Sequence, residues 1–130
     1  HQFVNAFAAN DPKSTSQIWN MLEHRISNRS TCIFLNTRSD RRYRTKQLMN
    51  LVFNEIQPDL FIIRGDDLPK EYHELINNHE SMDVKLFPET GSPSQLFEYF
   101  ASIESQFIMG IGNIVGWGEN FVSDIKEYRI

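Results

Sequence analysis

The stretch Phe3–Ile18 reads FVNAFAANDPKSTSQI and joins a short apolar strand, FVNAFA, to a helix through a polar turn. Pro12 fits the first helical position because the first amides of a helix have no partner within it. Asp11, directly before it, can accept those amides as an N-cap. Such a junction directs free N–H groups and a positive helix end toward whatever lies above the sheet. The stretch predicts either an ordinary capped helix start or a ligand-facing junction.

Strand and helix patterns alternate along the rest of the chain. Further strands are predicted from apolar runs of strand length, at Thr31–Asn36, Asp59–Arg64, Val84–Phe87 and Gln106–Ile111. Helices are predicted at about Asp11–Arg29, Arg41–Gln57, Pro69–Asn78, Ser94–Ser105 and from Gly112 to about Tyr128. Strands separated by helices indicate an α/β, three-layer domain with a mostly parallel sheet of five or six strands, covered on both faces.

The first two helices carry more specific predictions. A stripe at helical spacing predicts the buried face of the first helix, with members Ile18, Met21, Leu22, Arg25 and Ile26. Ser39 or Asp40 is expected to cap the second helix, and Pro58 to end it.

Size and charge restrict the class of protein. The 130 residues suit a single domain, residues 1–130, with ordinary apolar and charged contents of 40% and 23%. The net charge of −4 argues against nucleic-acid binding, which usually leaves a basic footprint. The single cysteine, Cys32, cannot form an internal disulfide, fits a reducing compartment, and is expected to be an inert core residue. No signal peptide is visible, and the most apolar stretch, Phe107–Trp117, is too short to span a bilayer.

Several catalytic motifs are missing from the sequence. The four histidines lack HExxH or CxxC companions, so no metal site is predicted. There is no GxSxG nucleophile elbow and no GxxxxGK[ST] phosphate loop. The chain also begins abruptly in a strand without a starting Met, and we expect it to be a fragment of a larger protein.

A cluster of cations follows the second predicted strand, in the run TRSDRRYRTK, Thr37–Lys46. It carries a net charge of +4 in ten residues, through Arg38, Arg41, Arg42, Arg44 and Lys46 against Asp40. Arginine forks bind carboxylate or phosphate groups in a bidentate manner. Because the cluster lies at a strand-to-helix junction, it predicts either an anion site or a solvated helix face with surface ion pairs.

Two other strand ends fall on the same predicted edge of the sheet. Arg64 and Asp66 follow the third strand, and the run from Gly110 through Gly112 to Asn113 follows the fifth. The GIGN run is similar to a phosphate-approach loop but misses the G-x-G-x-x-G spacing, so a tight structural turn is the favoured interpretation.

Three ordered motifs, FVNAFAANDPKST, FLNTRSDRRYRT and GIGNIVGWG, resemble the C-terminal part of the ligase subunit of poly-γ-glutamate synthase, a capsule-biosynthesis relative of the Mur ligases. The resemblance covers essentially the whole chain. Mur ligases carry an A-H-N-P turn in this domain, where this chain has Ala9–Pro12, with Asn10 in place of the His. It implies a Rossmann-like domain of the Mur-ligase C-terminal type.

The resemblance also implies a function. The complete protein would be an ATP-dependent amide ligase that polymerises glutamate through an acyl phosphate, with ATP and Mg²⁺ bound mainly by a domain that this chain does not contain. This domain alone is expected to be inactive. It would close over the nucleotide and help to bind glutamate. The expected nucleotide-facing residues are Asn10, Asp11 and Ser14, and the expected carboxylate-binding residues are Arg38, Arg41, Arg42 and Arg44.

Partners and location follow from the same resemblance. It implies glutamate and poly-γ-glutamate, other domains of the same protein and membrane subunits of a synthase as partners, at the cytoplasmic face of a bacterial membrane. Self-association is left open. The alternative is a non-catalytic α/β binding or assembly module that docks membrane subunits or another protomer, using the aromatic residues Trp117, Phe121 and Tyr128.

Overall fold

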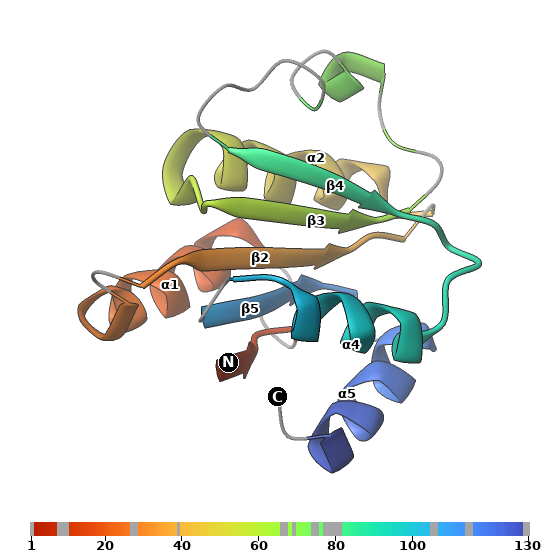
Figure 1. Cartoon of the computed structure of the whole chain (residues 1–130). Coiled ribbons are helices and arrows are strands. Elements are labelled where there is room, and N and C mark those ends of the chain that lie inside the picture. The colour runs from red at the N-terminus through yellow and green to blue at the C-terminus, as the bar shows by residue number, and fades with distance from the viewer. Residues whose placement is uncertain are drawn as a thin grey trace.

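A computed structural model of the chain describes residues 2–7, 11–26, 29–38, 40–65, 68, 70–73, 76, 82–104, 107–113 and 116–128. Its core is a five-stranded sheet in the order β1-β5-β2-β3-β4 (Figure 1). All neighbouring strands pair in parallel. Their bounds are Gln2–Asn5 for β1, Thr31–Asn36 for β2, Leu60–Arg64 for β3, Asp83–Phe87 for β4 and Phe107–Gly112 for β5. The predicted fold class is confirmed.

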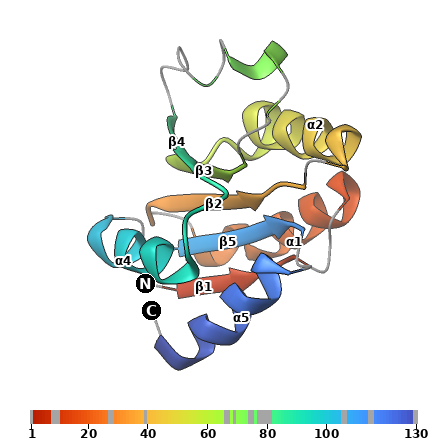
Figure 2. The same ribbon diagram turned by 90° about the vertical axis from the view of Figure 1, so that its right-hand side faces the viewer.

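Helices cover both faces of the sheet, as parallel strands require, because their connections must cross over a face. One face carries α1 and α2, and the other carries α4 and α5 (Figures 1 and 2). The bounds are Pro12–Ile26 for α1, Arg42–Leu51 for α2, Val52–Ile56 for the π-helical turn η1, Lys70–Tyr72 for the 3₁₀ turn η2, Pro93–Ser102 for α4 and Trp117–Tyr128 for α5. The protein is therefore a three-layer, Rossmann-like domain.

The apolar strands supply two separate cores. Along β2, Ile33 and Leu35 face the α1 and α2 side, whereas Cys32 and Phe34 face the α4 and α5 side. This alternation follows from the two-residue period of a strand. Because both faces of β2 are covered by helices, apolar residues are needed at successive positions, and this explains the continuous apolar run in its sequence.

The core under α4 and α5 is built mainly from aromatic rings. Phe34 lies at its centre, with ring centroids 5.4 Å from Phe121, 6.1 Å from Phe100 and 6.2 Å from Phe7. Phe97 stacks on Phe121 with centroids 5.0 Å apart. Tilted, edge-on and stacked pairs at these distances add about 0.5–1.5 kcal/mol each beyond the area they bury.

The buried face of α1 differs from the predicted stripe. Met21 was expected in the core but is 77% exposed, and Arg25 is also exposed. Trp19 and Thr15 are buried instead, and the Trp19 ring packs edge-on against Phe107 with centroids 6.3 Å apart. The physical reason is that indole has much more apolar area to bury than a thioether chain, so the helix presents Trp19 to the sheet.

The second predicted helix forms α2 followed by the π-helical turn η1. The Gln57 amide donates to the Val52 carbonyl at 2.9 Å, and Gln57 itself is left-handed with φ 49°. The expected cap is wrong for Asp40, because the N-cap is Arg41 and it makes no side-chain capping bond. Asp40 is paired with Arg38 at 2.6 Å instead. Ser39 lies outside the described residues.

The remaining elements agree with the sequence to within a few residues. The β2 strand has the predicted bounds, and α4 begins at a capping box in which Ser92 and Gln95 exchange side-chain and backbone hydrogen bonds. The predicted first strand is shorter than expected, since β1 ends at Asn5. In the described part of the segment predicted as Pro69–Asn78, the helix is reduced mainly to the 3₁₀ turn η2.

Candidate functional site

The carboxyl ends of the parallel strands meet at one edge of the sheet, where α1, α2 and α5 begin (Figure 1). The strand β5 lies between β1 and β2. The chain leaves β1 and β2 toward α1 and α2 on one face, but leaves β5 toward α5 on the other (Figure 2). Ligands of open α/β sheets bind outside the carboxyl ends of the strands, at a switch of this kind. The topology thus points to the carboxyl end of β5 and its neighbours as a candidate site.

The start of α1 is capped as predicted. The Ser14 amide donates to Asp11 Oδ1 at 2.9 Å, and the Thr15 amide donates to the Asp11 carbonyl at 3.0 Å. The bond from the Ser14 amide lowers the pKa of the Asp11 carboxyl below its ordinary value. Asp11 is exposed at the carboxyl edge, beside the positive end of the helix. Asn10 lies outside the described residues, so its expected nucleotide contact stays a prediction.

The arginine cluster lies at the same edge, between the end of β2 and the first turn of α2. Arg41, Arg42 and Arg44 are exposed, whereas Arg38 is held against Asp40. An exposed ion pair of this kind is worth at most about 1 kcal/mol, so it does not fix Arg38 firmly. The structure therefore presents cationic side chains to solvent at the sheet edge where a ligand is expected.

The ends of β2, β3 and β5 are joined by a hydrogen-bonded network. Arg64 Nη1 donates to Asn36 Oδ1 at 3.0 Å, and Asn36 Nδ2 donates to the Asn113 carbonyl at 2.7 Å. The Asn113 amide in turn donates to the Asn36 carbonyl at 2.8 Å. Arg64 Nη2 reaches the Glu89 carbonyl at 3.0 Å. Sequence reading singled out Arg64 and Asn113 but missed Asn36, whose signal was a polar residue at the very end of an apolar run.

This network gives Arg64 and Asn113 a structural role, because it holds the ends of neighbouring strands together. The backbone N–H of Asn113 donates to the Asn36 carbonyl, so this N–H is not available to bind an anion. Thr37 adds a second link between β2 and β3, with its hydroxyl donating to the Arg64 carbonyl at 2.6 Å. Asp66, predicted with Arg64 at this strand end, lies outside the described residues.

The glycines of the GIGN run are explained by packing. A Cβ on Gly110 would lie 2.7 Å from the rings of both Phe3 and Phe7, which cross β5 at this point. Gly112 has φ 97°, and a Cβ there would lie 2.5 Å from the Asn36 carbonyl oxygen. Both positions require glycine without any ligand. Gly110 through Gly112 lie within β5, so the run forms the end of a strand and not the expected tight turn, and its glycines have a structural role.

The aromatic residues near the end of the chain belong to the core and its border. Phe121 is fully buried, so the expectation that it forms an exposed docking surface is wrong. Trp117 is half-buried, with its ring stacked on Phe121 at 5.3 Å and its Nε1 donating to the Gly91 carbonyl at 2.9 Å. The Arg64 guanidinium lies over the same indole at 4.5 Å. The side chain of Tyr128 is not described.

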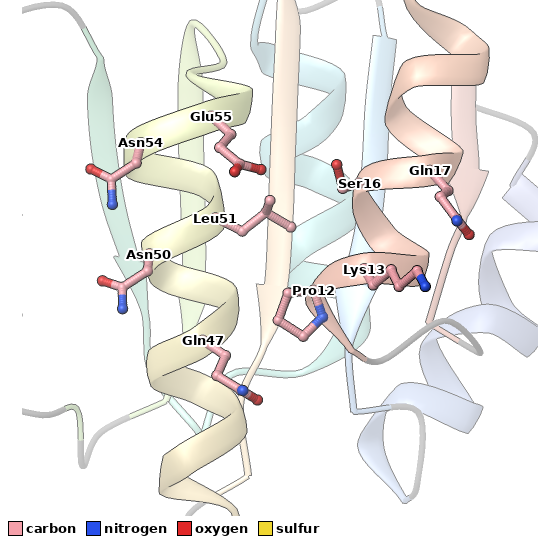
Figure 3. A pocket seen from close by; sticks show the side chains of 9 residues that line it. All are labelled: Pro12, Lys13, Ser16, Gln17, Gln47, Asn50, Leu51, Asn54 and Glu55. Atoms are coloured by element: carbon pink, nitrogen blue, oxygen red, sulfur yellow. The ribbon is translucent and has the colours of Figure 1, made fainter.

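A groove runs between α1 and α2 on the opposite face from this aromatic core (Figure 3). Its volume is about 460 Å³, within the roughly 300–1,000 Å³ of small-molecule sites. Amide side chains from both helices line it, together with Lys13 near the carboxyl edge of the sheet and Glu55 farther along the groove. No sequence pattern marks this groove, because most of its residues occupy ordinary polar positions on the two helices.

Other kinds of site find little support in the described part of the chain. No group of three or more His, Cys, Asp or Glu side chains could hold a metal ion there. Cys32 is buried, and burial raises the pKa of its thiol far above the ordinary value, so it is not a nucleophile. No described helix has both the length and the apolar character needed to cross a membrane.

A Rossmann-like domain with a cationic, ligand-accessible carboxyl edge is the class that this fold and this site define. Residues 1–128 match the family model of the poly-gamma-glutamate synthase CapB C-terminal domain, and the chain belongs to that family. The family resemblance stated from the three motifs is thereby confirmed.

Two curated relatives are similar to this chain over 98% of its length. PGA synthase CapB of Bacillus subtilis (strain 168) is 31% identical over 132 residues, and Capsule biosynthesis protein CapB of Bacillus anthracis is 28% identical over 141 residues. The chain spans 33% and 28% of the length of these relatives. No solved structure matches the chain significantly.

Proposed function

We propose that this domain is the C-terminal part of an ATP-dependent amide ligase that makes poly-γ-glutamate. The observation that carries the proposal is the match of residues 1–128 to a domain of poly-gamma-glutamate synthase. The exposed cations at the start of α2 support it, since glutamate and its polymer present carboxylates that arginine forks bind well.

The complete protein would activate a carboxylate of the growing chain as an acyl phosphate, using ATP and Mg²⁺ held mainly by another domain. The amine of the incoming glutamate would then attack that acyl group, with phosphate as the leaving group. In this scheme Arg38, Arg41, Arg42 and Arg44 hold glutamate carboxylates. Asn10, Asp11 and Ser14 face the nucleotide at the start of α1, where a positive helix end favours an anion. This domain alone would lack activity.

The same proposal covers partners and location. The complete protein would work with membrane subunits of the synthase at the cytoplasmic face of the membrane, with glutamate and poly-γ-glutamate as its ligands. The alternative of a non-catalytic docking module drew its support from exposed aromatic residues, and the burial of Phe121 removes part of that support.

The arginine assignment is tested in the complete protein by replacing Arg41 and Arg42 together with alanine. A lost charge-assisted hydrogen bond costs about 1.5–3 kcal/mol, so the KM for glutamate should rise about tenfold or more. The KM for ATP should stay near the wild-type value. Lys70→Ala, an exposed cation on η2, is the matched control. Unchanged glutamate dependence in the double variant would refute the assignment.

The nucleotide assignment has its own test. Asn10→Ala should raise the KM for ATP and leave the KM for glutamate unchanged, because the two ligands are assigned to different helix starts. Absence of any ATP-dependent glutamate ligation by the complete protein would contradict the proposed function itself.

A further inference from the structure

A cavity lies at the amino ends of β2, β3 and β4, at the opposite end of the sheet from the candidate site. Its volume is about 650 Å³. The end of α4 forms one side of it, because α4 runs back toward the amino ends of the strands before β5 begins (Figure 1). We name this feature the amino-edge cavity and define it by Asp59, Asp83, Lys85, Tyr99, Ile103 and Glu104.

The lining of the amino-edge cavity carries an excess of negative charge. Among its described residues, Asp59, Asp83 and Glu104 supply three carboxylates, and Lys85 supplies one ammonium group. Within the ranges that the structure describes, neither Asp83 nor Glu104 forms a salt bridge, and both are exposed. Asp59 has a structural role, because its Oδ2 accepts a hydrogen bond from the Thr31 amide at 2.8 Å. Asp83 and Glu104 are therefore the carboxylates that can meet a cation.

The end of α4 adds to this negative potential. The last carbonyl groups of a helix carry a partial negative charge, which favours a basic side chain nearby. The last turn of α4 has no basic residue. The distribution is opposite to that of the carboxyl edge, since the run Thr37–Lys46 carries +4 and the rest of the chain −8. The amino-edge cavity thus has charge complementarity to a cationic group.

The ring of Tyr99 shows how a cation fits against this lining. Lys85 Nζ lies over the ring, 4.5 Å from its centroid. Aromatic faces attract cations, and a planar guanidinium also stacks on them. Tyr99 and Ile103 are half-buried, so apolar surface lies between the carboxylates. An arginine side chain suits such a lining, because its apolar stem can pack on this surface while its guanidinium reaches a carboxylate.

We propose that the amino-edge cavity is the docking site for an arginine-bearing segment of a partner protein. The partner is a membrane subunit that presents a cytoplasmic loop, because such loops are rich in Lys and Arg. This identification rests on the proposed function, in which the complete protein works with membrane subunits. The cavity and the candidate site lie at opposite ends of the sheet (Figure 1). A docked partner therefore leaves the expected nucleotide and glutamate sites accessible.

The experiment measures the affinity of the complete protein for the purified membrane subunits in detergent. The double variant Asp83→Asn, Glu104→Gln removes two charges from the cavity and retains the side-chain shapes. Exposed charge pairs contribute little each, so the affinity should fall roughly three- to tenfold. The loss should come mainly from slower association and should shrink at high salt.

A matched control removes the same number of charges elsewhere. Glu23→Gln, Glu98→Gln changes two exposed carboxylates outside the cavity, on α1 and α4, and should leave the affinity near the wild-type value. The melting temperature of each variant confirms that it is folded.

Labelled peptides separate stacking from charge. An oligo-arginine peptide should bind the complete protein more tightly than an oligo-lysine peptide of the same length. Tyr99→Leu should remove most of that difference, because it removes the ring. Tyr99→Phe retains the ring and should retain the preference for arginine.

Three outcomes would overturn the inference. The first is an absence of binding to the membrane subunits, or an unchanged affinity in the cavity double variant. The second is an equal loss in the control double variant, which would show general charge attraction. The third is a preference for arginine that persists in Tyr99→Leu. An absence of ATP-dependent glutamate ligation, together with variant-sensitive binding to the membrane subunits, would contradict the proposed reaction and leave the docking site standing.

Discussion

Arg64 and Asn36, at the ends of neighbouring strands β3 and β2, are joined by a 3.0 Å hydrogen bond from Arg64 Nη1 to Asn36 Oδ1. The side-chain amide of Asn36 in turn donates a hydrogen bond to the carbonyl of Asn113, which directly follows β5. Three of the five strand ends are therefore tied together beneath the candidate site. The Arg64 guanidinium and the buried Asn36 side-chain amide hold the ends of these strands together. Their main contribution is therefore to position the backbone at the candidate site.

The first prediction concerns Asn36, which is 1% exposed and bonded at both ends of its amide. Asn36→Leu removes both bonds and leaves the Asn113 carbonyl without its side-chain donor. The free energy of unfolding should fall by about 1–3 kcal/mol, the cost of unpaired buried polar groups. Urea unfolding measures this change, and Asn20→Leu on the exposed side of α1 is the control. Equal stability of the two variants would show that the network does not hold the strand ends.

The sequence was sufficient to predict the fold because the strands are buried on both faces. Runs such as TCIFLN, residues 31–36, have no polar interruption, and a parallel sheet is the usual setting for such runs. Prolines and glycines then separated the elements, as Pro58 does after η1. Local signals and tertiary packing agree at these positions.

The sequence was insufficient where the local pattern allowed more than one arrangement and tertiary contacts determined which one formed. Met21 and Trp19 both suit a helix, and Trp19 is the one that packs against Phe107 of the sheet. The groove between α1 and α2 likewise depends on how two helices lie side by side, which no local spacing records. Asp40 matched a cap residue, but the nearby Arg38 pairs with it.

The second prediction concerns Gly110, over which Phe3 and Phe7 cross. Gly110→Ala places a methyl group 2.7 Å from both rings and should destabilise the protein by about 1–3 kcal/mol through overpacking. Adding Phe3→Leu removes one of the two ring contacts and leaves that with Phe7, so the double variant should lose less stability than the sum of the single variants. Thermal unfolding of the four proteins tests this. Strict additivity would mean that the contact with the Phe3 ring does not contribute to the requirement for glycine at this position.

The third prediction concerns Trp117, which joins α5 to the loop before α4. Trp117→Phe retains a stacked ring against Phe121 but loses the Nε1 bond to the Gly91 carbonyl, at a cost of about 0.5–1.5 kcal/mol. Trp117→Ala also loses the stacking and should cost about 3 kcal/mol or more. Tyr43→Ala, at a 74% exposed position, should have almost no effect. A Trp117→Ala cost no larger than that of Trp117→Phe would assign the whole contribution to the hydrogen bond.

The fourth prediction concerns pH and the Asp11 cap of α1. The Ser14 amide holds the folded-state pKa of Asp11 below its ordinary value, so the ionised carboxylate stabilises the folded protein. This stabilisation is complete above the unfolded pKa, about 3.9, and is lost as the pH falls through the folded pKa. The melting temperature of Asp11→Ala should therefore lie below that of the wild type at neutral pH, and the gap should narrow in acid.

Asp11→Asn separates the charge of this cap from its hydrogen bond. The asparagine amide oxygen can accept the same bond from Ser14 without titrating, so the variant should stay closer to the wild type than Asp11→Ala does at neutral pH. Its melting temperature relative to Asp11→Ala should not change with pH in the acid range. A wild-type advantage over Asp11→Ala that is constant from neutral pH down to about pH 2.5 would contradict a lowered pKa at Asp11. The cap would then act through its hydrogen bond alone, independently of the charge on the Asp11 carboxyl group.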